Sequence, residues 1–529
     1  MHTVAAAWQS VREDTAMYGG YLHPAIDFRA RRTSDWMGAE LVATEDIFRN
    51  GTNEFLLWEI PDSGSTSLTI DQAFQSYPDL VNVFKHMTIE LKNSPRETEY
   101  AIVGWYVAHL KRYRRHHISL TCLPDRCMSA HNFDTDIAKG FDDALVTDGF
   151  PPLFSTSGMK TRISYFFLLK AVASVAPRLS EIFKEITRDE FITGVCLLGT
   201  RVVGDLTKQL YRPFALNTFV LASSVMHIMN HEVSADISPP GPTTKYRTNS
   251  VADTLMVLER KWQIIMMDRA AGITSISKGE KLTDNYGDRP NANLIFAWGF
   301  MIPKNKLDCI IDKPIEDVWR ELQKNYPPFK QVEAFEIKVV FEYLKTVLLE
   351  KYEKNLEKCL GWTLYTDRSM NPLMMLVRFG AYFSQRRDFK EFESERENKL
   401  NSNYLELKAN KLRYYIGGII NMTMGKTDNC MNYSCLKYSN DRQSMDFFDK
   451  NYVLPVLCQY CQSRLVKIGS EDVQDDAMIE YSKYIMAGDQ FLDDGMTRNR
   501  STTRAAQSWL LARFRKDQRA LIKFCGGVC

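Results

Sequence analysis

The sequence contains no run of about eighteen uninterrupted apolar residues, so no membrane-spanning helix is predicted. Net charge is nearly absent, because 67 basic residues face 65 acidic ones and leave +2. This balance argues against a protein that coats nucleic acid through a global positive field, and no nucleic-acid partner is predicted. The opening residues also lack the apolar stretch of a secretory signal.

The cysteines do not form an evident disulfide framework, since the eleven of them are scattered and odd in number. We therefore expect a reducing, intracellular compartment, with the cytoplasm and an organelle such as the mitochondrion both left open. Two pairs of cysteines have spacings that zinc sites use. They are Cys430 with Cys435, and Cys458 with Cys461. The second pair lies in an apolar run, where free cysteine behaves as a small hydrophobic residue. We predict no metal, and zinc at these four cysteines is the alternative.

What the sequence does contain is enough apolar material for a large folded protein. Hydrophobic residues make up 45% and aromatic residues 12% of 529 positions, which excludes wholesale disorder. This length permits two or three domains, each with its own core.

The most informative stretch covers residues 278–300, KGEKLTDNYGDRPNANLIFAWGF. It predicts a turn at 278–280, a short strand that ends at Tyr286, a second turn, and a short helix closed by Gly299 and Phe300. Local pattern alone is also compatible with a hairpin that carries a core tyrosine. A tyrosine at a strand end, followed at once by glycine, is well placed to point its hydroxyl into a pocket.

This stretch resembles the C-terminal signature of SET-domain protein methyltransferases, and Met229-Asn230-His231 upstream resembles the Asn-His pair of that family. The nearest subclass is the Rubisco large-subunit methyltransferase and actin-histidine methyltransferase class. The resemblance implies that S-adenosyl-L-methionine binds at Asn230 and His231. It also implies that Tyr286 is the catalytic residue and that Phe300 contacts the cofactor.

Residues 35–61 resemble the opening element of the same family. Two strand-like runs lie around a turn, and Gly38 and Leu41 fit the positions of the cofactor-binding turn. Glu40 stands where the family has its second glycine. The added side chain and its negative charge face the carboxylate end of the cofactor, so we expect weakened cofactor binding.

Apolar residues at helical spacing predict helices within 70–84, 97–112, 162–185 and 187–203, the last capped by Thr187 or Asp189. Arg201, near the end of that last helix, resembles a family arginine that pairs with the cofactor carboxylate. A surface arginine is the competing interpretation. The basic cluster KRYRRHH at 111–117 predicts either a solvated helix end or an anion or RNA contact.

The resemblance implies an α+β fold, in which a SET-domain β-fold with a helical insertion precedes an all-α C-terminal domain of the substrate-binding type. Its parts are the N-terminal SET portion at 1–65, the insertion at 66–190, the second SET portion at 191–303 and the helical domain at 304–529. Residues 1–35 read as a lead-in and 304–330 as a hinge. Further helices are predicted within 333–360, 372–382, 404–422 and 502–524.

Two functions remain open at this point. The first is a protein-lysine, or histidine, N-methyltransferase, in which Arg289 and Trp298 line the substrate channel and no metal is needed. The second is a catalytically inactive SET-fold protein that serves as a structural or assembly subunit of a larger protein complex. Glu40, Glu232 and Trp298 favour the second, whereas Tyr286, Arg201 and the Asn230-His231 pair favour the first.

Overall fold

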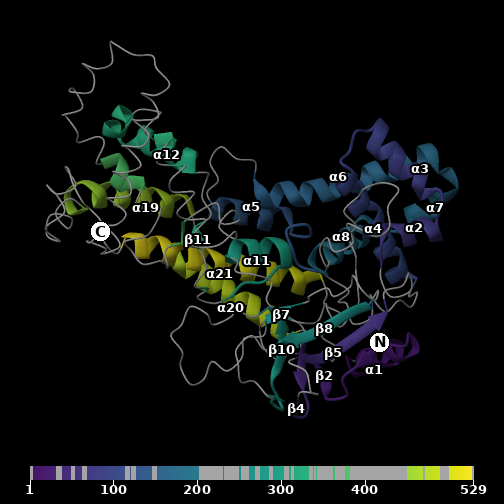
Figure 1. Ribbon diagram of the computed structural model, residues 1–529. Helices are drawn as coiled ribbons and strands as arrows, with labels where there is room; N and C mark the ends of the chain where they lie inside the picture. Colours follow the sequence, from purple (N-terminus) through teal and green to yellow (C-terminus); the bar gives the residue numbers. More distant parts are fainter. Residues whose placement is uncertain are drawn as a thin grey trace, which may run out of the picture.

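The chain folds into short β-sheets, a helical block inserted between their strands, and a second helical region at the C-terminal end (Figure 1). The computed structural model describes residues 4–30, 39–48, 54–61, 68–113, 120, 127–145, 152–201, 230–231, 249–251, 261–267, 275–284, 290–302, 305, 309–310, 315–332, 337–338, 341, 362–363, 376–381, 449–468, 471–488 and 500–526. Helix is the commonest structure among them, and the fold is of mixed α and β type.

The first sheet has the strand order β1-β5-β8-β7 and is antiparallel throughout. Its strands are β1 (Tyr21–Leu22), β5 (Glu54–Pro61), β8 (Lys261–Met267) and β7 (Asn249–Val251). The two strand-like runs predicted within 35–61 are confirmed as β3 (Ala39–Ala43) and β5. Chain segments about 200 residues apart therefore pair directly.

The second sheet has the order β2-β3-β10-β6. It consists of β2 (Ile26–Ala30), β3 (Ala39–Ala43), β10 (Lys281–Asp284) and β6 (Asn230–His231). Two short pairs complete the strands, β4 (Ile47–Phe48) with β9 (Ser275–Ile276) and β11 (Cys309–Ile310) with β12 (Trp362–Thr363).

The interpretation of residues 1–35 as a lead-in is wrong for the described part. Helix α1 (Val4–Met17) is followed by β1 and β2, so this segment belongs to the sheets. Trp8 is buried and stacks on Phe28 of β2, with ring centroids 5.9 Å apart. The turn residues at 18–24 are present, but they only connect α1, β1 and β2 and do not form a long irregular segment.

In the sequence, the helical insertion lies between β5 and β6. It contains α2 (Ile70–Ser76), α3 (Leu80–Lys85), α4 (Pro95–Arg112), α5 (Thr135–Leu145), α6 (Leu153–Val175), α7 (Ser180–Glu185) and α8 (Arg188–Arg201). The predicted helices at 70–84 and 162–185 are each interrupted, close to Pro78 and Pro177. Proline cannot donate the hydrogen bond that an uninterrupted helix needs.

Helices α4 and α8 pack unusually closely. A Cβ atom on Gly104 would lie 2.4 Å from Val195 Cγ2, and one on Gly194 would lie 2.1 Å from the Gly104 carbonyl oxygen. The core around this crossing is completed by aromatic rings, and Trp105 stacks on Phe183 with centroids 3.7 Å apart. The helical block is therefore held by a glycine contact that leaves no room for side chains.

A second core joins the insertion to later parts of the chain. It contains Phe141 of α5 and Phe154 of α6, together with Ile295 of α11 (Asn291–Trp298) and Phe514 of α21 (Arg500–Gly526). The predicted helix at 502–524 is thus confirmed. Figure 1 shows α21 (yellow) running past α11, and the contacts of α21 with α5 join parts of the chain more than 350 residues apart.

The C-terminal region includes α12 (Ile315–Asn325), α19 (Leu454–Ile468) and α20 (Asp472–Gly488). Helix α12 lies inside the segment predicted as a hinge, so that prediction is wrong there. Arg464, which is 1% exposed, pairs with Glu321 at 3.1 Å and joins α19 to α12. Of the helices predicted within 333–422, most residues lie outside the described part, and 376–381 are helical.

The domain boundaries drawn from the sequence remain predictions. No helix among the described residues is both long and apolar enough to span a membrane.

The glycine contact yields a stability prediction. Gly194→Ala should lower the free energy of unfolding by about 1–3 kcal/mol, because the new methyl group overlaps the backbone of α4. Gly199→Ala is the matched control in the same helix: its Cβ meets His131 at 3.4 Å, an ordinary contact. The control should be neutral or stabilising by up to about 1 kcal/mol, since alanine favours helix. Chemical denaturation measures both, and equal effects would contradict the packing argument.

Candidate functional site

Three segments that lie far apart in the sequence meet on the second sheet. Strand β10 pairs with β3 on one side, with Leu282 opposite Leu41. On its other side it pairs with β6, with Thr283 opposite Asn230 and Asp284 opposite His231. The structure therefore brings the Asn-His pair, the N-terminal strand and the strand before Tyr286 into one place.

The pairing of β6 with β10 is parallel, whereas β3 pairs with β10 antiparallel. Parallel neighbours need a long crossover connection and cannot be joined by a hairpin. Among the described strands, β6 ends the order of this sheet. One backbone edge of Asn230-His231 is thus not used by this sheet, and edge strands present N–H and C=O groups to ligands.

Several predicted site residues lie outside what the structure describes. Gly38, Tyr286 and Arg289 are not among the described residues, and neither are the side chains of Glu40, Arg201, Asn230 and His231. For Glu40 the backbone is informative: it lies within β3, directly opposite Arg29 of β2. The predicted turn at this position is therefore wrong, because Ala39 and Glu40 are already extended.

Two further predicted residues have described side chains. Leu41 is 2% exposed, between β2 and β10. Phe300 is 8% exposed, and Trp298 at the end of α11 is half-buried. Leu41 of β3 and Phe300, which follows α11, thus both belong to the apolar interior.

The segment that carries Phe300 is fixed by Asn291, whose side chain is fully buried. Its Nδ2 donates to the Ile302 carbonyl at 3.0 Å, and its Oδ1 accepts from the Ile302 N–H at 2.9 Å. Asn305 Nδ2 donates to the same oxygen at 3.3 Å. Helix α11 ends at Gly299, whose φ of +74° favours glycine, as the sequence predicted.

Close packing gives a second reason for glycine at position 299. A Cβ atom there would lie 2.2 Å from the Met128 carbonyl oxygen. The end of α11 is therefore pressed against the 127–133 segment of the helical insertion.

Thr187 caps helix α8, as predicted, whereas Asp189 does not. The Glu190 N–H donates to Thr187 Oγ1 at 3.3 Å, and Glu190 Oε2 accepts from the Thr187 N–H at 2.8 Å. These bonds and Arg112 lower the pKa of Glu190, although burial opposes them as the largest single influence. At its other end α8 carries Thr200 and Arg201.

Cys127 and Cys196 form a disulfide, which differs from the expectation of free thiols. Both are buried, and the bond joins the 127–133 segment to α8 across 69 residues of sequence. Cys458 and Cys461 are also disulfide-bonded, so they are not thiolate ligands in this structure. Cys430 and Cys435 lie outside the described residues, and no group of metal-ligating side chains occurs among those described. Spacing alone could not reveal the pair at 127 and 196, because tertiary folding brings it together.

His131 anchors the same segment. Its Nδ1 lies 3.1 Å from Thr161 Oγ1 and 3.2 Å from Ser157 Oγ, both on α6. Burial lowers the pKa of His131 to about 4, because it disfavours the charged imidazolium. A neutral histidine satisfied by hydroxyl groups is a structural element, and we assign it no acid-base role.

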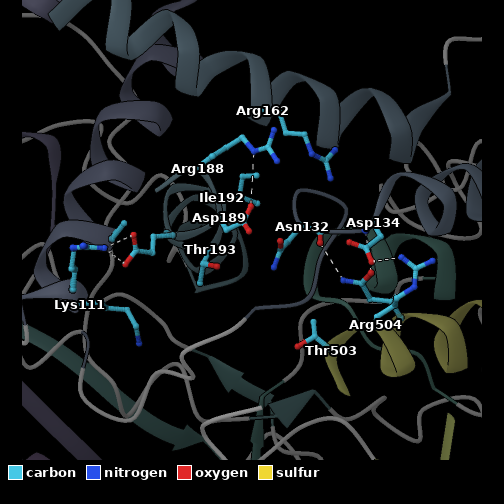
Figure 2. A pocket seen from close by; sticks show the side chains of 15 residues that line it. Lys111, Asn132, Asp134, Arg162, Arg188, Asp189, Ile192, Thr193, Thr503 and Arg504 are labelled. Atoms are coloured by element: carbon cyan, nitrogen blue, oxygen red, sulfur yellow. Dashed lines mark hydrogen bonds and ion pairs between the residues drawn. The ribbon is translucent and has the colours of Figure 1, made fainter. Parts of the chain in front are cut away.

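A charged cleft of about 430 Å³ lies at the junction of the helical insertion with α21 (Figure 2). Five basic and three acidic side chains line it, drawn from α4, α6, α8, α21 and the segment before α5. They are Lys111, Arg112, Arg162, Arg188, Arg504, Asp134, Asp189 and Glu190. None of these residues belongs to the predicted cofactor motifs.

Only one edge of this cleft carries a signal in the sequence. Lys111 and Arg112 open the basic cluster at 111–117, and both line the cleft at the end of α4. Arg112 forms a two-bond pair with Glu190, at 2.8 and 2.9 Å. The prediction of a helix end is confirmed for 111–112. The other walls come from residues up to about 390 positions away, which no local signal connects.

The chain is similar to known proteins in structure but not in sequence. No model of a protein family matches the chain, and no curated protein matches it in sequence. Among solved structures, the SET domain of LSMT bound to lysine and AdoHcy is similar, with 13% identity and a TM-score of 0.47 over 98% of this chain and 90% of that one. Rubisco LSMT bound to sinefungin and monomethyllysine gives 13% and 0.46 over 99% and 91%. Likeness at this level does not by itself assign the chain to that family.

The buried asparagine of α11 provides a test. Asn291→Ala should lower the free energy of unfolding by about 1–3 kcal/mol, because it leaves the Ile302 backbone groups and Asn305 without their partner. Asn82→Ala, at an exposed position of α3, is the matched control and should change it by less than about 0.5 kcal/mol. Thermal and denaturant unfolding compare the two. A neutral Asn291 variant would show that the 299–305 segment is held by other contacts.

Proposed function

We propose that this chain is a SET-fold protein N-methyltransferase that uses S-adenosyl-L-methionine to methylate lysine or histidine of a protein substrate. The observation that carries the proposal is the register of β10, which has Leu41 on one side and Asn230-His231 on the other. These are the segments whose motifs resemble the family. Agreement between an independent sequence pattern and strand pairing supports a common site.

Chain connectivity supports the place of Tyr286 in this site. It follows the last residue of β10, Asp284, by two positions, and two residues span at most about 7 Å. Asp284 is paired with His231. This short separation in sequence supports a pocket shared by Tyr286 and the Asn-His pair.

The residues present suit a cofactor with an apolar ring and a polar amino-acid end. The edge of β6 that pairs with no described strand offers backbone groups for the adenine and the amino end, and the buried side chains of Leu41 and Phe300 make the adjoining interior apolar. Arg201, at the C-terminal end of α8, is assigned to the cofactor carboxylate, for which a guanidinium fork is suited.

Bound S-adenosyl-L-methionine would supply a methyl group on a positively charged sulfur. The chain's part is to hold a neutral nitrogen in line with that carbon and to exclude water. We assign the orientation to the Tyr286 hydroxyl, which stabilises the charge that develops on the nitrogen. Arg289 and Trp298 line the substrate entrance. Burial would favour the neutral form of an incoming lysine by lowering its pKa.

Glu40 favours a second candidate, an inactive SET-fold subunit of a protein complex. It occupies a strand position where the family has a glycine turn. The register places the Glu40 backbone opposite that of Arg29 in β2.

The catalytic assignment predicts that Tyr286→Phe abolishes methyl transfer while leaving cofactor affinity within about threefold, because the hydroxyl orients the nitrogen and does not hold the cofactor. Tyr481→Phe is the matched control, since Tyr481 is 66% exposed on α20 and should behave as wild type. Transfer of radiolabelled methyl to protein lysates measures activity, and calorimetry measures binding. An active Tyr286→Phe variant would refute the assignment.

A second experiment separates enzyme from scaffold. Glu40→Gly should strengthen S-adenosyl-L-methionine binding by about tenfold or more, because it removes a like charge near the cofactor carboxylate. Glu45→Gly, at an exposed position just after β3, controls for the loss of charge and the added backbone freedom. Asn230→Ala should weaken binding. If calorimetry detects no binding to the wild type or to Glu40→Gly at high micromolar cofactor, the scaffold function is supported instead.

A further inference from the structure

The charged cleft (Figure 2) is a site separate from the cofactor motifs. It is open to solvent on one side and has a volume of about 430 Å³, within the range of about 300–1,000 Å³ that ligand sites occupy. It lies where α21 meets the helical insertion. The two parts are joined there by Gln507, which accepts from the Asp134 N–H at 3.0 Å and donates to the Asn132 carbonyl at 3.1 Å.

Two of the three acidic side chains that line the cleft, Glu190 and Asp134, are paired with arginines that also line it. Glu190 is paired with Arg112 and also caps α8. Asp134 accepts from Arg504 at 2.9 Å, and Arg504 also bonds Asp136 at 2.5 Å. These carboxylates therefore have their positive partners within the wall.

Arg162 and Arg188 are used differently. Arg162 donates to the Phe133 carbonyl at 2.9 Å and has no carboxylate partner within the described part of the chain. Arg188 lies 3.9 Å from Asp189, and both are more than half exposed, so this contact contributes little. Figure 2 shows Arg162 and Arg188 on the same side of the cleft. Two guanidinium groups on one wall form a receptor for carboxylates.

We propose that the charged cleft binds an acidic segment of a partner protein, with Arg162 and Arg188 as the residues that hold its carboxylates. The hydroxyl group of Thr193 lies on the same lining and suits a peptide backbone. Arg162 and Arg188 can hold the one or two carboxylates that a short acidic segment offers, whereas affinity for a nucleic acid comes from neutralising many successive phosphates. The small number of such arginines in the lining therefore favours a short acidic peptide over RNA.

The cleft and the proposed cofactor site are connected by one rigid element. Helix α8 presents residues 188–194 to the cleft and carries Arg201 at its other end. Its 14 residues extend for about 20 Å. A segment held at the cleft is thus positioned about 20 Å from the proposed methyl-donor site. The inference concerns binding alone and does not require that site to be active.

The test measures binding of fluorescein-labelled hexaglutamate to the full chain by anisotropy, without cofactor. We expect binding that weakens as salt rises from about 50 to about 300 mM, because the contacts are between charges in water. Arg188→Glu and Arg162→Glu should each weaken it by about tenfold or more. Arg188→Glu is the cleaner variant, since the position is exposed at a helix start where glutamate is favoured.

Arg178→Glu is the matched control, an exposed arginine of the insertion that does not line the cleft. It should bind hexaglutamate like the wild type, and hexalysine and hexauridylate should bind more weakly than hexaglutamate. No hexaglutamate binding, an equal loss in Arg178→Glu, or tighter binding of hexauridylate would overturn the proposal. Because cofactor is absent, these outcomes are independent of those of the methyl-transfer experiments.

Discussion

The structure depends most on strand β10, residues Lys281–Asp284, which has a partner on each side. On one side β3 comes from the first 45 residues, and on the other β6 comes from position 230. Backbone hydrogen bonds in a sheet are satisfied only by neighbouring strands, so β10 holds together segments that the helical insertion separates. If β10 were displaced, the Asn-His pair and the N-terminal strand would share no element, and the proposed cofactor site would not exist.

The helical insertion positions the other parts of the site through α8. This helix packs on α4 at the Gly104–Gly194 contact, and the Cys127–Cys196 disulfide ties it to the 127–133 segment. That segment in turn contacts Gly299, at the end of α11. A continuous series of tight contacts thus connects the charged cleft, the end of α8 and the segment that carries Phe300. Close-packed interiors transmit such constraints because they cannot deform gradually.

Predictions that depend on residues close together in the sequence were correct, and those that depend on distant residues were not. Thr187 as the cap of α8, Gly299 as the end of α11 and the amphipathic helix near the C-terminus were all correct, because each depends on neighbours within a few residues. The lead-in at 1–35 and the hinge at 304–330 were wrong. In both, turn residues were abundant, but the apolar residues between them found distant partners.

By itself the sequence determined the local elements and the set of motifs that resembles a methyltransferase, since both are patterns along one chain. Tertiary structure alone decided that Leu41 and Asn230 flank the same strand, that Glu40 stands opposite Arg29, and that Arg162 and Arg188 share a cleft with α21. Each of these contacts joins residues that are not close neighbours in the chain. Register and side-chain clustering are settled by pairing and packing between such segments, for which a linear pattern carries no signal.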